Sequence, residues 1–162
     1  MELVIAVDDP RAPDVRSLLE AHLSFASEMS PAEHVHALDT DGLLDPSITF
    51  FSARRDGVLV GVGAIKQLDE THTELKSMHT ATVARRQGVG RAMVEHLVSI
   101  ASALGCARVS IETGTTEAFA SARAMYEQRG FRTCEPFGQY TLNPYSTCMT
   151  IFLDTAPRGN EP

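Results

Sequence analysis

Residues 48–68 place two apolar runs on either side of the dipeptide Asp56-Gly57. The first run, ITFFSARR, covers residues 48–55, and the second, VLVGVGAIKQL, covers residues 58–68. An Asp-Gly pair between two such runs is the strongest short signal for a β-hairpin with a two-residue turn. The sequence therefore predicts two antiparallel strands joined by a tight turn.

The other segments alternate between strand and helix patterns. Residues 72–82 predict a further strand, and 88–105 predict the clearest helix, in which apolar residues repeat at helical spacing before Gly105. Further strands are expected at 2–7, 107–113, 131–137 and 146–153, helices at 8–29, 30–38 and 115–130, and a loop at 42–46. Hairpins joined to strand–helix–strand units predict an α/β fold with a mixed central sheet flanked by helices.

The chain has the size and composition of one globular domain. Its 162 residues are 43% hydrophobic and 22% charged, which suffices for one core. We expect residues 1–154 to form this domain and 155–162 to form a frayed tail. No apolar run approaches the ~20 residues that span a bilayer, and the N-terminus lacks the features of a signal peptide. We therefore expect no membrane association and a cytoplasmic location.

Charge, cysteine spacing and histidine spacing disfavour three classes of site. The formal net charge of −7 argues against nucleic acid as a partner, because phosphate binding needs a broad basic surface. Cys106, Cys134 and Cys148 form no C-x-x-C pair and are interpreted as reduced thiols that fill space. The two histidines of HVH (34–36) do not face each other on a helix, so no metal site is expected.

Residues 83–91, VARRQGVGR, form a basic island that holds three arginines, two glycines and no acid. A helix N-terminus leaves about four backbone N–H groups unpaired and carries roughly half a positive charge, and glycines let a ligand approach that backbone. Together with the arginines, these features suit the phosphate oxygens of one small anionic ligand. From these residues alone, a solvated turn with chance arginines is an equal alternative. The spacing is not that of a Walker loop, and no G-x-G-x-x-G follows the first strand, which disfavours a generic nucleotide-binding domain.

The run Arg85-Arg86-Gln87-Gly88-Val89-Gly90 matches the pattern Arg/Gln-x-x-Gly-x-Gly/Ala, and with it the chain resembles the Gcn5-related N-acetyltransferase (GNAT) family. ELKSMHTAT is similar to that family's fourth strand, and ARAMYEQRGF to its A-x-x-Leu-Tyr-x-x-x-Gly-Phe segment, with Met125 at the leucine position. The order of elements agrees over nearly the whole chain. Arg86 stands where many members have glycine, Thr82 where many have proline, and Phe119 where asparagine is common. The last departure removes one polar contact near the pantetheine arm of the cofactor.

The resemblance implies acetyl-CoA as the donor, an amine as the acceptor, and direct transfer in a ternary complex. The residues that it assigns to cofactor binding are Met78, Thr80, Arg85, Arg86, Gln87, Gly88, Val89, Gly90 and Arg91. The pyrophosphate is expected on the loop, and the pantetheine arm along the backbone near Met78 and Thr80, as an added strand would lie. A homodimer is compatible with the resemblance. The acceptor is left open among a small amine, an amino acid, an antibiotic and a peptide N-terminus.

Acetylation of an amine needs a proton acceptor, because an alkyl ammonium of pKa ~10.4 is neutral in only about one molecule per thousand at pH 7. Glu74 is the predicted base, since it lies eleven residues before Arg85, the offset of the catalytic glutamate in several family members. Glu112, His79 and a route through water are the alternatives. Tyr126 matches the family tyrosine near the CoA sulfur and is the predicted acid, with a packing role as its alternative.

Two loop-like segments, 34–36 and 136–140, are expected to line the acceptor pocket. The alternative for the whole protein is a CoA-binding regulatory or structural module without transfer activity. Only Glu74 and Tyr126 argue against that alternative at the level of sequence.

Overall fold

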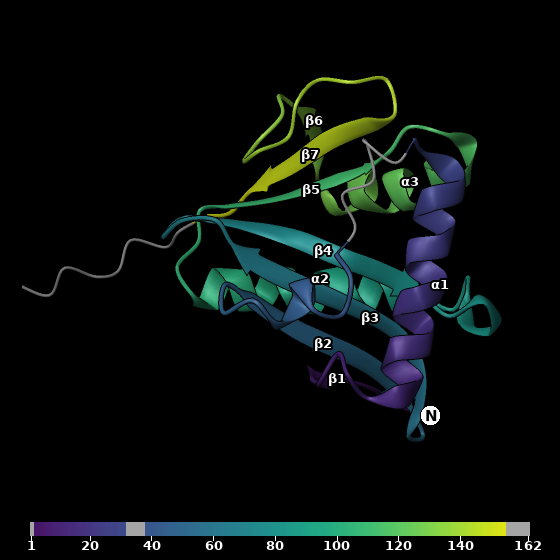
Figure 1. Cartoon of the computed structure of the whole chain (residues 1–162). Coiled ribbons are helices and arrows are strands. Elements are labelled where there is room, and N and C mark those ends of the chain that lie inside the picture. Colours follow the sequence, from purple (N-terminus) through teal and green to yellow (C-terminus); the bar gives the residue numbers. More distant parts are fainter. Residues whose placement is uncertain (1, 32–37, 155–162) are drawn as a thin grey trace, which may run out of the picture.

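The structure, a computed structural model, describes residues 2–31 and 38–154. These residues form a mixed seven-stranded sheet with helices on both faces (Figure 1). The strands are β1 (Leu3–Val7), β2 (Ile48–Arg55), β3 (Val58–Gln67), β4 (His72–Thr80), β5 (Arg108–Gly114), β6 (Arg132–Cys134) and β7 (Ser146–Phe152). The α-helices are α1 (Pro13–Met29), α2 (Val89–Ala103) and α3 (Ala120–Arg129). The strand order is β1-β2-β3-β4-β5-β7-β6. The predicted mixed α/β sheet is confirmed.

The predicted hairpin joins β2 and β3, which pair antiparallel from Ile48↔Lys66 to Arg55↔Val58. Its turn residues, Asp56 and Gly57, have φ values of 52° and 79°. Both values lie in the left-handed region, which the primed hairpin turns require and which Asp-Gly tolerates. The hairpin prediction is therefore confirmed, including its turn.

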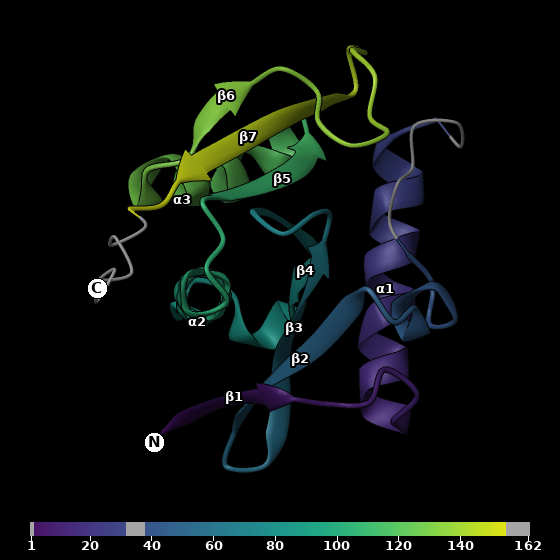
Figure 2. The same cartoon turned by 90° about the vertical axis from the view of Figure 1, so that its left-hand side faces the viewer.

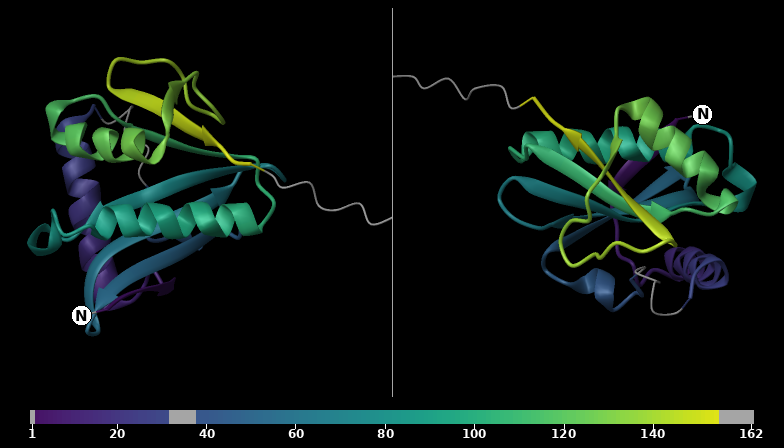
Figure 3. Two further views of the ribbon diagram at one scale, coloured as in Figure 1. Left: turned by 180° about the vertical axis from the view of Figure 1, so that it is seen from behind. Right: turned by 90° about the horizontal axis from the view of Figure 1, so that it is seen from above.

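The helices divide between the two faces of the sheet. α1 covers one face, whereas α2 and α3 lie on the other (Figures 2 and 3). α1 begins with Pro13 in its first turn, where the missing N–H is not needed, and buries Val15 and Leu19 against β2 and β3. α2 buries its apolar stripe in the larger core, with Leu97 fully buried. Leu104, predicted on that stripe, is instead 54% exposed because it lies at the C-cap, after the helix ends.

The sheet opens between β4 and β5. These two strands pair in parallel only from His72↔Arg108 to Leu75↔Ile111, and then diverge toward their carboxyl ends (Figure 1). α1 crosses the open end of the resulting wedge. Every other neighbouring pair of described strands is antiparallel, so the wedge opens at the single parallel pair.

Several predicted boundaries differ from the observed ones. The strand predicted at 131–137 ends at Cys134, because Pro136 has no N–H to donate to a neighbouring strand. The helix predicted at 115–130 starts with a 3-10 turn, Glu117–Phe119, before α3, and the loop at 42–46 contains another, Gly42–Leu44. Most of the helix predicted at 30–38, and the tail at 155–162, lie outside the described residues. Among the described helices, none has both the length and the apolar character needed to cross a membrane.

Candidate active site in the wedge between β4 and β5

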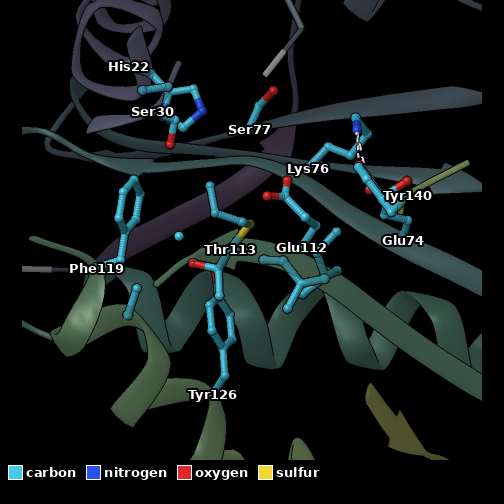
Figure 4. Close-up of a pocket in the computed structure, with 16 residues that line it drawn as sticks. His22, Ser30, Glu74, Lys76, Ser77, Glu112, Thr113, Phe119, Tyr126 and Tyr140 are labelled. Atoms are coloured by element: carbon cyan, nitrogen blue, oxygen red, sulfur yellow. Dashed lines mark hydrogen bonds and ion pairs between the residues drawn. The ribbon is translucent and has the colours of Figure 1, made fainter. Parts of the chain in front are cut away.

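A pocket of about 130 Å³ lies in the wedge where β4 and β5 separate. Its walls come from α1, β4, β5 and α3, and Tyr140 closes one side from the segment between β6 and β7 (Figure 4). Segments from five parts of the chain therefore converge on one small space. The expectation that residues 136–140 line a pocket holds for Tyr140, whereas residues 34–36 lie outside the described part of the chain.

A bulge in β4 shapes the wall of this pocket. The register of β4 against β3 passes from Ala64↔Lys76 to Val62↔His79, so that Ser77 and Met78 both stand opposite Gly63. Ser77 has a φ of 55°, in the left-handed region. No described strand pairs with the β5-facing edge of β4 beyond Leu75. The backbone around Met78 and Thr80, two of the predicted cofactor residues, therefore lies along an open strand edge.

The basic island forms the turn that starts α2. Arg86 and Gly88 adopt left-handed φ values of 63° and 82°, and no side chain caps the helix N-terminus. The helix therefore begins at Val89 with its first backbone N–H groups unpaired by any cap. Arg86 occupies the position where glycine is common in the family, and its positive φ explains that preference.

The side chains of this island divide into two groups. Val89 is buried in the core, and the Gln87 amide accepts a hydrogen bond from Arg55 Nη1 at 2.7 Å and donates one to the Val83 carbonyl at 3.3 Å. The Val89 side chain is therefore out of reach of a ligand, whereas the Gln87 side chain is exposed and already hydrogen-bonded within the protein. Arg91 is exposed and donates to Gln128 Oε1 at 3.0 Å. The sequence pattern could not reveal this division, because it depends on neighbours that are distant in the chain.

Glu74 is buried, with 4% of its surface exposed. Its Oε2 accepts hydrogen bonds from Tyr140 Oη and from Lys76 Nζ, the latter at 3.3 Å. Lys76 Nζ also donates to Tyr140 Oη at 3.0 Å. The carboxylate predicted as the base therefore lies in a compact cluster with an ammonium and a phenol, at the side of the pocket (Figure 4).

Glu112 enters the same pocket from β5. Its carboxylate points into the space between Ser77 and Thr113 (Figure 4). Burial raises the pKa of Glu112 from 4.5 to about 7, opposed by the Lys76 charge and a hydrogen bond from Ser146, and assisted by the charge of Glu74. A carboxyl with that pKa exchanges its proton near neutral pH, which suits a general base.

Tyr126 lies on α3 and points toward the pocket from below (Figure 4). Only 2% of its surface is exposed, and its ring packs edge-to-face against Phe131 with ring centroids 5.6 Å apart. Burial raises the pKa of its phenol, so the hydroxyl keeps its proton at neutral pH. The side chain combines the packing role and the pocket-facing role that the sequence left as alternatives.

His79 points to the α1 side of β4, where its Nδ1 lies 3.1 Å from Nδ1 of His22. Burial lowers the pKa of both imidazoles to about 4; the charge of Arg85 adds to the effect on His79, and that of His79 to the effect on His22. At neutral pH both rings are therefore uncharged, with one Nδ1–H donating to the other ring. The pair links α1 to β4, a contact that neither histidine's local sequence indicated.

Phe119, at the position where asparagine is common in the family, lies at the start of α3. Its ring packs against Phe25 of α1 with ring centroids 5.0 Å apart, and it lies against Gly114 so closely that a Cβ there would overlap it. An apolar contact between α1 and α3 thus replaces the polar group.

In the described part of the chain, no group of three or more His, Cys, Asp or Glu side chains is arranged to hold a metal ion.

The family model for GNAT acetyltransferases matches residues 14–131. The chain belongs to the GNAT family. It is 42% identical over 146 residues to an uncharacterized N-acetyltransferase, YsnE, of Bacillus subtilis, covering 90% of this chain and 97% of that protein. It is 40% identical to another, YedL, of Escherichia coli, covering 92% and 94%. On this basis the protein is an N-acetyltransferase.

A GNAT acetyltransferase from Elizabethkingia anophelis, solved with acetyl-CoA bound, shares the fold. The two structures superpose with a TM-score of 0.70 over 93% of this chain and 98% of that one, at 17% identity. At this identity the likeness concerns the fold alone, which is that of GNAT enzymes.

Proposed function

We propose that the protein transfers an acetyl group from acetyl-CoA directly to a primary amine, with both substrates bound at once. The observation that carries this proposal is the pocket itself, in which an open strand edge, the Glu112 carboxylate and the Tyr126 hydroxyl converge. A proton acceptor and a proton donor that line one small space are what acyl transfer to an amine requires.

The chain offers the groups that would hold acetyl-CoA. The uncapped N-terminus of α2, with backbone N–H groups of residues 86–91, suits a pyrophosphate. A Cβ built on Gly88 meets nothing within 4 Å, so the turn is open to an approaching ligand. Arg85 and Arg91 would add charge, and the open edge of β4 at Met78 and Thr80 would pair with the amide groups of the pantetheine arm. Acetyl-CoA bound in this way supplies a thioester-activated acetyl group.

We assign Glu112 as the proton acceptor. Its carboxylate faces the pocket, and its pKa of about 7 lets it take a proton from the incoming ammonium near neutral pH. Glu74, the residue predicted from sequence, stays a prediction. Its contacts with Lys76 and Tyr140 favour a role in shaping the acceptor side of the pocket instead.

Tyr126 is assigned as the proton donor to the leaving sulfur. Its phenol stays protonated because burial raises its pKa, so a proton is present at Oη when the sulfur leaves as the thiolate of a thiol with pKa ~8.5. The incoming ammonium thus loses one proton to Glu112. Tyr126 Oη protonates the leaving sulfur and regains a proton from the nitrogen, which must lose its second proton after attacking the acetyl carbonyl. Backbone N–H groups at the β4 bulge near Met78 are the proposed donors to the developing oxyanion.

Thermal denaturation with and without acetyl-CoA tests the cofactor assignment. A hundredfold excess over the dissociation constant stabilises a protein by ~2.7 kcal/mol, which corresponds to a rise in Tm of roughly 5–10 °C for a chain of this size. Arg91→Glu should reduce the rise, because it places a negative charge beside the phosphates. Arg16→Glu, an equal charge change on the exposed side of α1, is the matched control. No rise with millimolar acetyl-CoA would rule out the cofactor assignment.

The sequence left a CoA-binding module without transfer activity as the alternative, and the family assignment disfavours it. The raised pKa of Glu112 argues for an enzyme, because a binding module gains nothing from burying a carboxylate beside its ligand site. Turnover distinguishes the two. An enzyme releases CoA only when a suitable amine is added, whereas a binding module shows the same thermal stabilisation with no release.

A further inference from the structure

Three side chains form a row across the end of the sheet beside the pocket. Glu112 on β5 pairs in register with Cys148 on β7, and Cys148 pairs in turn with Cys134 on β6. Directly opposite residues on antiparallel strands project to the same face of a sheet. The two thiols therefore stand side by side, with Cys148 between Cys134 and Glu112.

The backbone spacing at this pair suits a disulfide. Opposite residues in antiparallel strands have Cα atoms about 4.5–5.5 Å apart, which lies within the range of about 4.4–6.8 Å found for disulfides. Both cysteines are free thiols. β6 is an edge strand, and Cys134 is half-buried there, whereas Cys148 is buried.

We propose that Cys134 and Cys148 form a reversible disulfide when the protein meets a peroxide. The Cys134 sulfur, which solvent can reach, attacks one peroxide oxygen; the O–O bond breaks, Cys134 becomes a sulfenic acid and one water leaves. The Cys148 sulfur then attacks the sulfenic sulfur, the S–S bond forms, the S–O bond breaks and a second water leaves. Two thiols are oxidised by two electrons and one peroxide is reduced to two waters. This inference does not depend on the acetyl-transfer function.

The order of these steps follows from the surroundings of the two thiols. Burial raises the pKa of Cys148 to about 11, with further increases from the charges of Cys134, Glu112 and Glu74, while the Phe137 backbone N–H opposes the shift. Cys148 is thus a protonated, sheltered thiol, so the peroxide reacts first at Cys134, and the proton of Cys148 must be removed in the second step. Glu112 lies on its other side in the same row and offers a carboxylate that accepts protons near pH 7.

The bond would also act on the pocket. The segment between the two cysteines carries Tyr140, which contacts Glu74 and Lys76 on the acceptor side. A disulfide between Cys134 and Cys148 would close this segment into a covalent loop. It would therefore restrain the segment that bears a pocket wall, in addition to joining β6 to β7.

The test uses the purified full chain at low concentration, treated with a small excess of hydrogen peroxide. Trypsin leaves both cysteines in one peptide, since no Lys or Arg lies between Arg132 and Arg158. Additional cleavage with chymotrypsin after Phe137, Tyr140 and Tyr145 separates them. We expect the two fragments to remain joined, with two hydrogens missing from their summed mass, until a reductant releases them.

Three variants make the result specific. Cys106→Ala removes the other buried thiol and should leave the linked fragments unchanged, whereas Cys134→Ser and Cys148→Ser should each abolish them. Closing a loop of this length should raise the Tm of the oxidised Cys106→Ala protein by on the order of 5 °C or more. The proposal is wrong if peroxide gives only sulfinic acid at Cys134 or only disulfides between molecules. It is also wrong if the linked fragments persist in Cys134→Ser or in Cys148→Ser.

Discussion

Replacing Glu112 by glutamine should change how the stability of the fold depends on pH. Burial raises the pKa of Glu112 from 4.5 to about 7, so the folded protein holds this proton more tightly than the unfolded chain does. A shift of this size corresponds to a destabilisation of roughly 3 kcal/mol once the carboxyl is ionised. The value is an upper bound, since part of the carboxyl faces the pocket and its water.

The sign follows from the raised folded-state pKa. Between about pH 4.5 and pH 7 the folded state binds more protons than the unfolded state, so the free energy of unfolding falls as pH rises. This loss of stability is absent below pH 4.5, the pKa of the carboxyl in the unfolded chain, and complete above about pH 7. Glu112→Gln keeps the shape of the side chain and has no proton to lose, so this part of the pH dependence should disappear.

Denaturant unfolding at pH 5, 6, 7 and 8 measures the effect. We expect Glu112→Gln to gain stability relative to wild type as pH rises, by up to roughly 3 kcal/mol between the two ends. Glu20→Gln, on the exposed side of α1, controls for the loss of one negative charge. A difference between Glu112→Gln and wild type that stays constant over the four pH values would refute the assignment of a raised pKa to Glu112.

Three further substitutions test the packing and the chemistry. Tyr126→Phe should lower kcat by on the order of 10²-fold or more with little change in acetyl-CoA affinity, and an unchanged kcat across pH 6–9 would leave Tyr126 with packing alone. Gly114→Ala should cost ~1–3 kcal/mol of stability, because the new Cβ overlaps the Phe119 ring; an unchanged Tm would mean that the ring moves freely. Leu97→Ala removes a fully buried side chain of α2 and should lower the free energy of unfolding by ~2–5 kcal/mol, which denaturant titration measures directly.

Local chemistry made part of the fold predictable from sequence. The turn at Asp56-Gly57 and the apolar repeat of α2 each carry their own physical signal, and both elements were found within one or two residues of the expected bounds. The predicted boundaries were wrong where the end of an element depends on residues outside it. The short strand β6 ends before Pro136, and α3 begins late, after a 3-10 turn that places Phe119 against Gly114.

Some residues of the candidate pocket were named from sequence, whereas the geometry of the pocket was not predictable. Glu74, Glu112, Met78 and Tyr126 were all named from sequence, and all four line the pocket. Which carboxylate faces the open space depends on Tyr140, which contacts Glu74 from 66 positions away in the chain. The sequence placed Glu74 ahead of Glu112 on its offset from Arg85, and no local pattern encodes its contact with Tyr140.

The most direct test of acetyl transfer is to measure CoA release and the acetylated product with purified protein, acetyl-CoA and a panel of primary amines. We expect at least one amine to yield both in equal amounts, with a rate that rises through about pH 7 as Glu112 loses its proton. Glu112→Gln should lose ~10²–10⁴-fold in kcat/KM with that amine. Stabilisation by acetyl-CoA without release for any amine, or a Glu112→Gln protein with the wild-type pH profile, would contradict these expectations.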